Sequence, residues 1–187
     1  QWATQWYDRK YLEMYSSYQP ERIWATQGGQ STLDSYGMDM PEKHLKFFRS
    51  LLPFHLDQKD RLFVHGGIDP NKKVEMHRLD YLTWDRDLLE SAWQKSFRNP
   101  KYQFSSYNEI FVGHTTTQWF ARNKERSILT PTELAKLGTE PLFLCNVIGI
   151  DTGAGWNGKL TIMNVENKEY WQSDLVEELY PEYKGRT

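Results

Sequence analysis

The chain has 187 residues, of which 39% are hydrophobic and 15% aromatic, enough to bury the core of one domain. Its 23 Lys and Arg residues against 25 Asp and Glu residues leave a net charge of -2. This balance, together with the absence of any run of ~18 apolar residues, excludes a strongly basic nucleic-acid-binding protein and a membrane-spanning one. The single cysteine, Cys145, cannot form an intrachain disulfide, so we expect a cytoplasmic protein with no nucleic-acid or membrane partner.

Residues 1–56 are predicted to be mainly helical. Apolar and aromatic side chains recur there at three- and four-residue intervals, which places them on one face of a helix. Glycine and proline mark the ends of these segments. The predicted helices cover residues 1–18, 31–37 and 41–52.

Residues 57–172 are predicted to be rich in strands, and residues 173–187 to form a peripheral tail. Short apolar runs bounded by polar turns are typical of strands. All 187 residues are assigned to one α/β domain. One helix is predicted over residues 87–97. Residues 115–141 are predicted to be irregular except for a short helix over 132–136. The predicted strands cover residues 54–56, 62–64, 110–112, 142–150, 160–165 and 169–172.

Two histidines follow short apolar strands, and each lies beside a glycine. His65 precedes two glycines, and His114 follows Gly113. A histidine at a strand end lies at the edge of the sheet, where glycines let a ligand approach the backbone. Imidazole is a good ligand for Zn, Mn and Fe. The repeated pattern favours a metal site, although a structural hydrogen bond explains either histidine taken alone.

Two further residues have alternative interpretations. Arg86 offers a planar fork of donors that suits a phosphate, but it could equally pair with Asp85 or Asp87 at the start of a helix. Asp151 opens a glycine-rich turn, where its carboxylate could bind a ligand or accept backbone N–H groups.

Four segments in this order resemble motifs of the phosphoprotein-phosphatase family of calcineurin-like metallophosphoesterases. Together they cover residues 62–165 and match the family patterns VHAG(I/L), WxR, FGHT and IDTGA...GGxLT. The region around residues 28–37 also resembles the helical insertion of small prokaryotic members. The four segments are Val64-His65-Gly-Gly-Ile68, Trp84-Asp-Arg86, Phe111-Val-Gly-His114-Thr115, and Ile150-Asp-Thr-Gly-Ala154 with Gly158-Lys-Leu-Thr161.

The resemblance implies a sandwich of two mixed β-sheets flanked by helices, with two divalent metal ions (Mn, Fe or Zn) at the strand ends. It makes His65 and His114 ligands of one metal and Arg86 a clamp on the substrate phosphate. The implied reaction is attack of a metal-activated hydroxide on a phosphate monoester, in a phosphorylated protein or a small molecule. Further candidate neighbours of this site are Asp85, Asp151, Trp119 and Trp156, and for both tryptophans a role in the core is the alternative.

The family's upstream motifs, of the forms GDxHG, GDxxDRG and GNH(D/E), do not occur in the sequence. They carry the remaining metal ligands, and the first residue is Gln rather than Met. We therefore expect that an N-terminal portion with the first strands is missing and that this chain alone binds metal poorly. The alternatives are a dinucleoside polyphosphate hydrolase, a non-catalytic binding module with a degenerate phosphatase fold, and an unrelated sheet protein with structural histidines.

Overall fold

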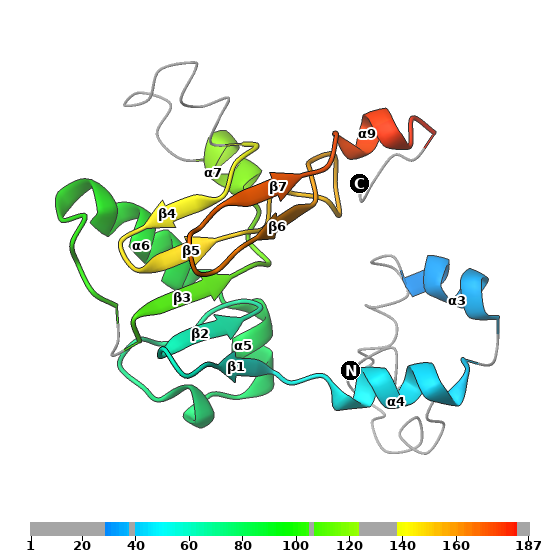
Figure 1. The fold of residues 1–187 in the computed structure, drawn as a ribbon, viewed down its shortest axis with the longest axis horizontal. Coiled ribbons are helices and arrows are strands. Elements are labelled where there is room, and N and C mark those ends of the chain that lie inside the picture. The colour runs from blue at the N-terminus through cyan, green and yellow to red at the C-terminus, as the bar shows by residue number, and fades with distance from the viewer. Residues whose placement is uncertain (1–28, 38–39, 105–106, 124–137, 183–187) are drawn as a thin grey trace. The chain divides into compact units, whose positions relative to one another are not determined.

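The structure is a computed structural model that describes residues 29–37, 40–104, 107–123 and 138–182 (Figure 1). The chain divides into two compact units, essentially residues 1–52 and residues 53–185, close to the predicted boundary between a helical and a strand-rich part. That both belong to one domain stays a prediction. The helices predicted over 1–18 and 132–136 lie outside the described residues. Within the described part of the chain, no helix has the length and apolar character needed to cross a membrane.

The first unit contains helices α3 (Gln30–Tyr36) and α4 (Glu42–Ser50), as predicted. Gly37 ends α3 with a φ of 64°, a left-handed conformation that glycine adopts without steric penalty. The Tyr36 hydroxyl and His44 Nδ1 lie 2.9 Å apart and join the two helices.

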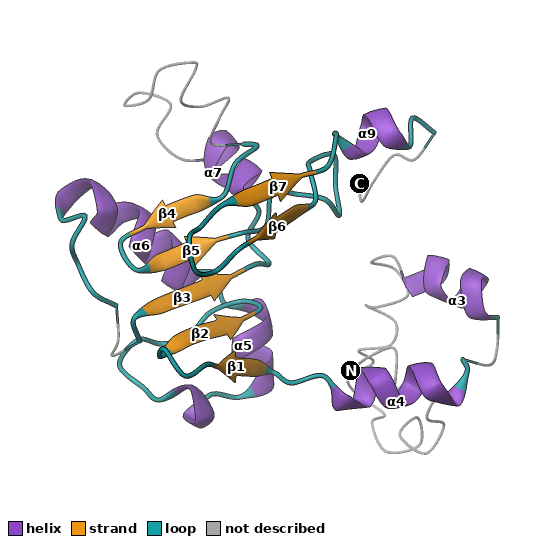
Figure 2. Cartoon of the chain, in the orientation of Figure 1, coloured by secondary structure: helices purple, strands orange, loops and turns teal. Residues whose placement is uncertain are grey.

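The second unit is built on a five-stranded mixed sheet with the strand order β1-β2-β3-β5-β4 (Figure 2). Strands β2, β3 and β5 run parallel, and the two edge strands β1 and β4 run antiparallel to their neighbours. The α/β class and the first hairpin are thus confirmed. The bounds are β1 (Phe54–Leu56), β2 (Arg61–Val64), β3 (Glu109–Val112), β4 (Leu142–Leu144) and β5 (Val147–Gly149).

The prediction of one strand over residues 142–150 is wrong, because the chain reverses in the middle of it. Cys145 adopts a left-handed φ of 57°. The Asn146 side chain accepts a hydrogen bond from the Phe104 N–H and donates to the carbonyls of Phe104 and Tyr107. These bonds hold a tight turn, so β4 folds back antiparallel on β5. Two short buried strands therefore gave the apolar pattern of a single long one.

Helix α6 (Asp87–Arg98) confirms the helix predicted over 87–97. Four other elements occupy segments for which the sequence predicted no regular structure. Helix α7 begins where the Thr117 N–H donates to the Asp151 carbonyl, 2.8 Å away, which contradicts the irregular structure predicted after residue 115. The additional elements are η3 (Val74–Met76), α5 (Leu79–Trp84) and α7 (Thr117–Asn123), and a short helix α9 (Val176–Leu179) lies in the tail.

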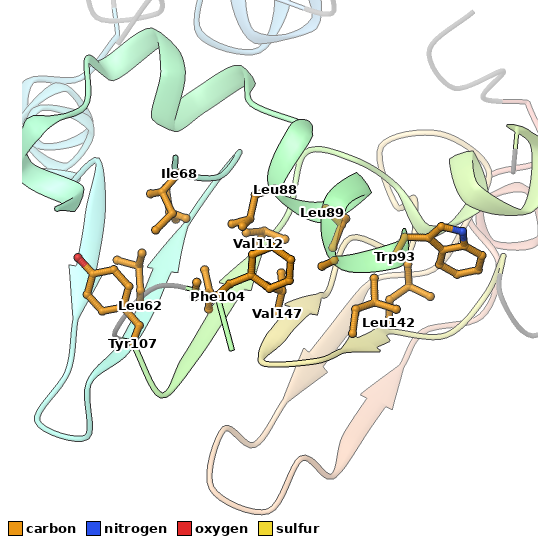
Figure 3. Packing of buried hydrophobic residues seen from close by; sticks show 14 of the residues in the cluster. Leu62, Ile68, Leu88, Leu89, Trp93, Phe104, Tyr107, Val112, Leu142 and Val147 are labelled. Carbon is orange, nitrogen blue, oxygen red and sulfur yellow. The ribbon is translucent and has the colours of Figure 1, made fainter. Parts of the chain in front are cut away.

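The main core lies between one face of the five-stranded sheet and α6 (Figure 3). Leu62, Val112 and Val147 project from the three parallel strands towards Leu88 and Leu89 of α6, and all five are at most 2% exposed. Each such side chain contributes roughly 1.5–3 kcal/mol through removal of apolar surface from water. This packing fixes the parallel strands relative to one another and so aligns their ends.

The terminal hairpin is confirmed as a separate two-stranded sheet of β6 (Thr161–Met163) and β7 (Tyr170–Gln172). It covers the other face of the large sheet, where Phe63 and Phe111 stack with ring centroids 4.8 Å apart. Lys168 of the hairpin turn lies 5.4 Å from the centre of the Phe111 ring. The second unit is therefore layered as helix, sheet and hairpin.

Candidate functional site

Three of the predicted site residues meet at one edge of the sheet. His65, His114 and Asp151 lie just after β2, β3 and β5, respectively. In the register of these parallel strands, Val64 pairs with Val112 and Val112 with Gly149, so the three strand ends are level. Ligands in open α/β sheets bind at the carboxyl ends of the strands. The fold thus brings together residues that are far apart in the sequence.

The two histidine rings face each other across the ends of β2 and β3. Their centroids are 5.1 Å apart, and the Gly113 N–H donates to the His65 carbonyl at 2.9 Å. His114 has a φ of 58°, which costs a non-glycine residue on the order of 1 kcal/mol. Its Nε2 atom is buried and forms no hydrogen bond. A strained residue with an unpaired buried nitrogen is typical of a ligand-binding position.

The surroundings of both imidazoles lower their pKa and so favour the neutral form. Burial is the main cause that lowers the pKa of His114 to about 4, with Arg86 and His65 acting in the same direction. Burial also lowers the pKa of His65, where Asp151 opposes and Arg86 reinforces the effect. Neutral imidazole is the form that binds metal ions.

Arg86 lies beside the histidines at the start of α6. Its Nη1 donates to the Thr115 hydroxyl at 3.1 Å and more weakly to the His114 carbonyl at 3.5 Å. Both acceptors are neutral oxygens, so the guanidinium brings a positive charge to the site. This arrangement differs from the alternative in which Arg86 pairs with Asp85 or Asp87. An exposed guanidinium keeps further N–H donors for an anion.

Asp85 has a structural position at this site. It is 8% exposed, and its carboxylate accepts the Leu88 N–H at 3.2 Å, which satisfies a free donor in the first turn of α6. Burial raises the pKa of Asp85. The same carboxylate lies against Gly67, where an added Cβ would come within 2.3 Å of Oδ2. Asp85 therefore joins the loop after His65 to the start of α6.

The two predicted tryptophans lie in different surroundings. Trp119 packs against the main core, with its ring centroid 5.0 Å from that of Phe120, which agrees with the core alternative. Trp156 is 43% exposed on the glycine-rich turn, and its backbone N–H donates to the Gly153 carbonyl. Neither position shows that the tryptophan lines the histidine site.

Sequence reasoning missed Trp84 and Thr115 as site residues. The Trp84 ring meets the His114 ring edge-on at 5.0 Å, and Thr115 is the main hydrogen-bond partner of Arg86. Both adjoin predicted site residues in the sequence, which was the available signal. The Trp84 contact requires the end of α5 to lie beside the end of β3, and the Thr115 contact requires the same of the start of α6. No sequence pattern shows either arrangement.

The residues fit part of a metal site. His65 and His114 could contribute two neutral nitrogens, and the unpaired Nε2 of His114 suits this role. Asp151 is near enough to affect the pKa of His65, but its Oδ1 already accepts the Gly153 N–H at 3.0 Å. Among the described residues, no three His, Cys, Asp or Glu side chains are arranged to hold a metal ion.

No protein-family model matches the chain, and a comparison with curated proteins finds no match either. Assignment to the phosphoprotein-phosphatase family therefore stays a prediction, based on the four sequence motifs.

Proposed function

We propose that this chain contributes to a metal-dependent phosphoesterase that hydrolyses phosphate monoesters. The observation that carries the proposal is the meeting of two histidines and an arginine at the ends of parallel strands. His65 and His114 are the proposed ligands of one of two divalent ions. A bound ion of this kind would supply an activated hydroxide and charge neutralisation at phosphorus.

Arg86 is the proposed phosphate clamp. Its contact with Thr115 orients the guanidinium beside the histidines, and the donors that remain can form two parallel hydrogen bonds to a phosphate. The long side chain is exposed, so an anion could approach it from solvent.

The metallophosphatase sandwich is part of the same proposal. The five-stranded sheet and the β6–β7 sheet, with helices on the outer face of the larger one, support it. The proposed substrates are a phosphorylated protein or a small phosphate monoester. Hydrolysis of a dinucleoside polyphosphate, at a phosphoanhydride bond, is the alternative activity.

A non-catalytic phosphate-binding module is the second candidate. It is favoured by one observation, namely that the described residues supply two histidines and no third metal ligand near them. Such a module would bind phosphate through Arg86 without hydrolysing an ester.

Binding experiments test the site directly. We expect His65→Ala and His114→Gly each to lower the affinity of the chain for Mn²⁺ or Zn²⁺ by about tenfold or more, as measured by calorimetry. Glycine is chosen at position 114 because it accepts the left-handed backbone. His55→Ala, an exposed histidine of β1, is the matched control and should have no effect. Unchanged metal affinity in both site variants would contradict the ligand assignment.

Arg86→Ala gives an independent result. It should weaken the binding of inorganic phosphate by about tenfold, since a charge-assisted pair is lost, and leave metal affinity nearly intact. Hydrolysis of p-nitrophenyl phosphate in the presence of Mn²⁺ distinguishes the two candidate functions, because a phosphoesterase hydrolyses this ester and a binding module does not. Phosphate binding that does not depend on Arg86 would remove this residue from the proposed site.

A further inference from the structure

A groove of about 670 Å³ is formed by side chains of residues 72–85, which include η3 and α5, and it adjoins the histidine site through Trp84. Its lining includes Met76, Arg78, Tyr81 and Trp84. The volume is within the range of small-molecule sites and is far larger than a phosphate group requires. The groove could therefore hold a substantial organic group.

The lining presents apolar and aromatic surface to solvent. Met76 is 71% exposed, Tyr81 38% and Trp84 41%. Burying such surface against an aromatic ring is favourable, both through the hydrophobic effect and through offset or edge-on ring contacts. These three side chains are therefore suited to a flat aromatic ligand.

Two cations also line the groove. Arg78 pairs with Asp80 at 3.2 Å, and Lys72 pairs with Asp69 at 3.0 Å. The Arg78 and Lys72 side chains are 87% and 57% exposed. Exposed ion pairs of this kind contribute little stability, so either cation can exchange its partner for an anionic ligand group.

Trp84 connects the groove to the proposed phosphate site. Its ring lines the groove and also meets the His114 ring edge-on at 5.0 Å. Arg86 lies two residues further along the chain, and its guanidinium bonds to Thr115 beside that same histidine. A ligand with its phosphate at Arg86 could thus place an attached ring over Trp84.

We propose that this groove binds the aromatic part of a phosphomonoester whose phosphate is held at Arg86. The inference rests on the proposed function and adds the class of substrate. A phosphotyrosine side chain and a nucleoside monophosphate share the required chemistry, an aromatic ring and a phosphate joined by a short link.

The test compares four ligands in binding to the full chain, measured by calorimetry. Phosphotyrosine and adenosine monophosphate carry the ring, and phosphoserine and ribose 5-phosphate lack it. The first pair should bind about fivefold more tightly than the second, the effect of one buried ring contact. The tighter of the two aromatic ligands identifies the source of the ring. Equal affinities for all four ligands would overturn the proposal.

Met76→Ala should reduce this difference without changing the affinity for inorganic phosphate. The matched control is Leu79→Ala. Leu79 is an exposed apolar residue like Met76, with 42% of its surface exposed, but it does not line the groove. An equal effect of both substitutions would overturn the assignment of the groove.

Failure of the phosphate site can be told apart from failure of the groove. Arg86→Ala should weaken all four ligands and inorganic phosphate alike. If the wild-type chain does not bind inorganic phosphate, the proposed function fails, and the groove is then tested with tyrosine amide and adenosine. If tyrosine amide and adenosine bind and Met76→Ala weakens their binding, the groove assignment is supported. If neither compound binds, the groove assignment is overturned.

Discussion

His114 combines three features that are each unfavourable for a folded chain. Its backbone is left-handed, its Nε2 atom is buried without a partner, and its pKa is lowered to about 4. Strain and perturbed protonation gather at functional sites, where the surrounding structure compensates for them. At the scale of single residues, His114 is therefore the strongest indication of a binding site.

The pH dependence of stability tests this view. Because burial lowers the pKa of His114 from 6.5 to about 4, the unfolded chain binds more protons than the folded chain between these values. The free energy of unfolding should then fall as pH decreases from about 6.5 to 4, by on the order of 2 kcal/mol after allowance for the partial exposure of the ring. The lowered pKa of His65 acts in the same direction.

Urea unfolding at pH 7.5, 5.5 and 4.5 measures this loss. His114→Asn should reduce it, since asparagine does not titrate and tolerates the left-handed backbone. His55→Asn serves as the control and should keep the wild-type profile. An unaltered pH profile in the His114 variant would show that the imidazole is not held neutral.

At the scale of elements, the loop after β2 is fixed by its glycines. A Cβ on Gly66 would lie 2.8 Å from the Asp85 nitrogen and from the Thr83 carbonyl carbon, both in the backbone. The Gly66 N–H donates to the Leu82 carbonyl at 2.7 Å. The loop that carries His65 therefore lies directly on the end of α5, and only glycine allows so close an approach.

Gly66→Ala should destabilise the chain by about 2 kcal/mol, because the backbone of α5 cannot move aside as a flexible side chain would. It should also weaken metal binding, since His65 would be displaced. Gly155→Ala is the matched control, because a Cβ at Gly155 has nothing within 4 Å. Thermal or urea unfolding compares the two. Equal stabilities would mean that the loop is not held against α5.

Much of the element arrangement could be predicted from the sequence. The two hairpins, α6 and the strand before each histidine follow from local apolar patterns and turn residues. The reversal at Cys145 could not be predicted, because it depends on bonds from Asn146 to Phe104 and Tyr107, about 40 residues away in the chain. The same limit explains Thr115, whose role appears only when β3 and α6 are placed together.

At the scale of the whole second unit, ion pairs attach the β6–β7 hairpin to the sheet at the end opposite the histidines. Arg61, at the start of β2, bonds to Asp57, to Glu166 and to the Val165 carbonyl. Lys59 pairs with Glu166, and Lys168 with Glu109 at 2.8 Å. A two-stranded sheet is marginally stable alone, so these contacts help to keep the hairpin on the face that contains Phe111.

Replacement of Arg61 should therefore loosen the hairpin more than the main sheet. In Arg61→Met, the carboxylates of Asp57 and Glu166 and the Val165 carbonyl lose a shared donor, and amide hydrogen exchange should accelerate across β6 and β7. The amides of β3 should keep their protection, because they bond within the sheet.

Arg61→Lys, which keeps one charge but not the planar fork, should give an intermediate result. Arg98→Met, an exposed arginine at the end of α6, should leave exchange in the hairpin unchanged. Equal acceleration in β3 and in the hairpin would mean that Arg61 supports the whole unit rather than the attachment of one sheet to the other.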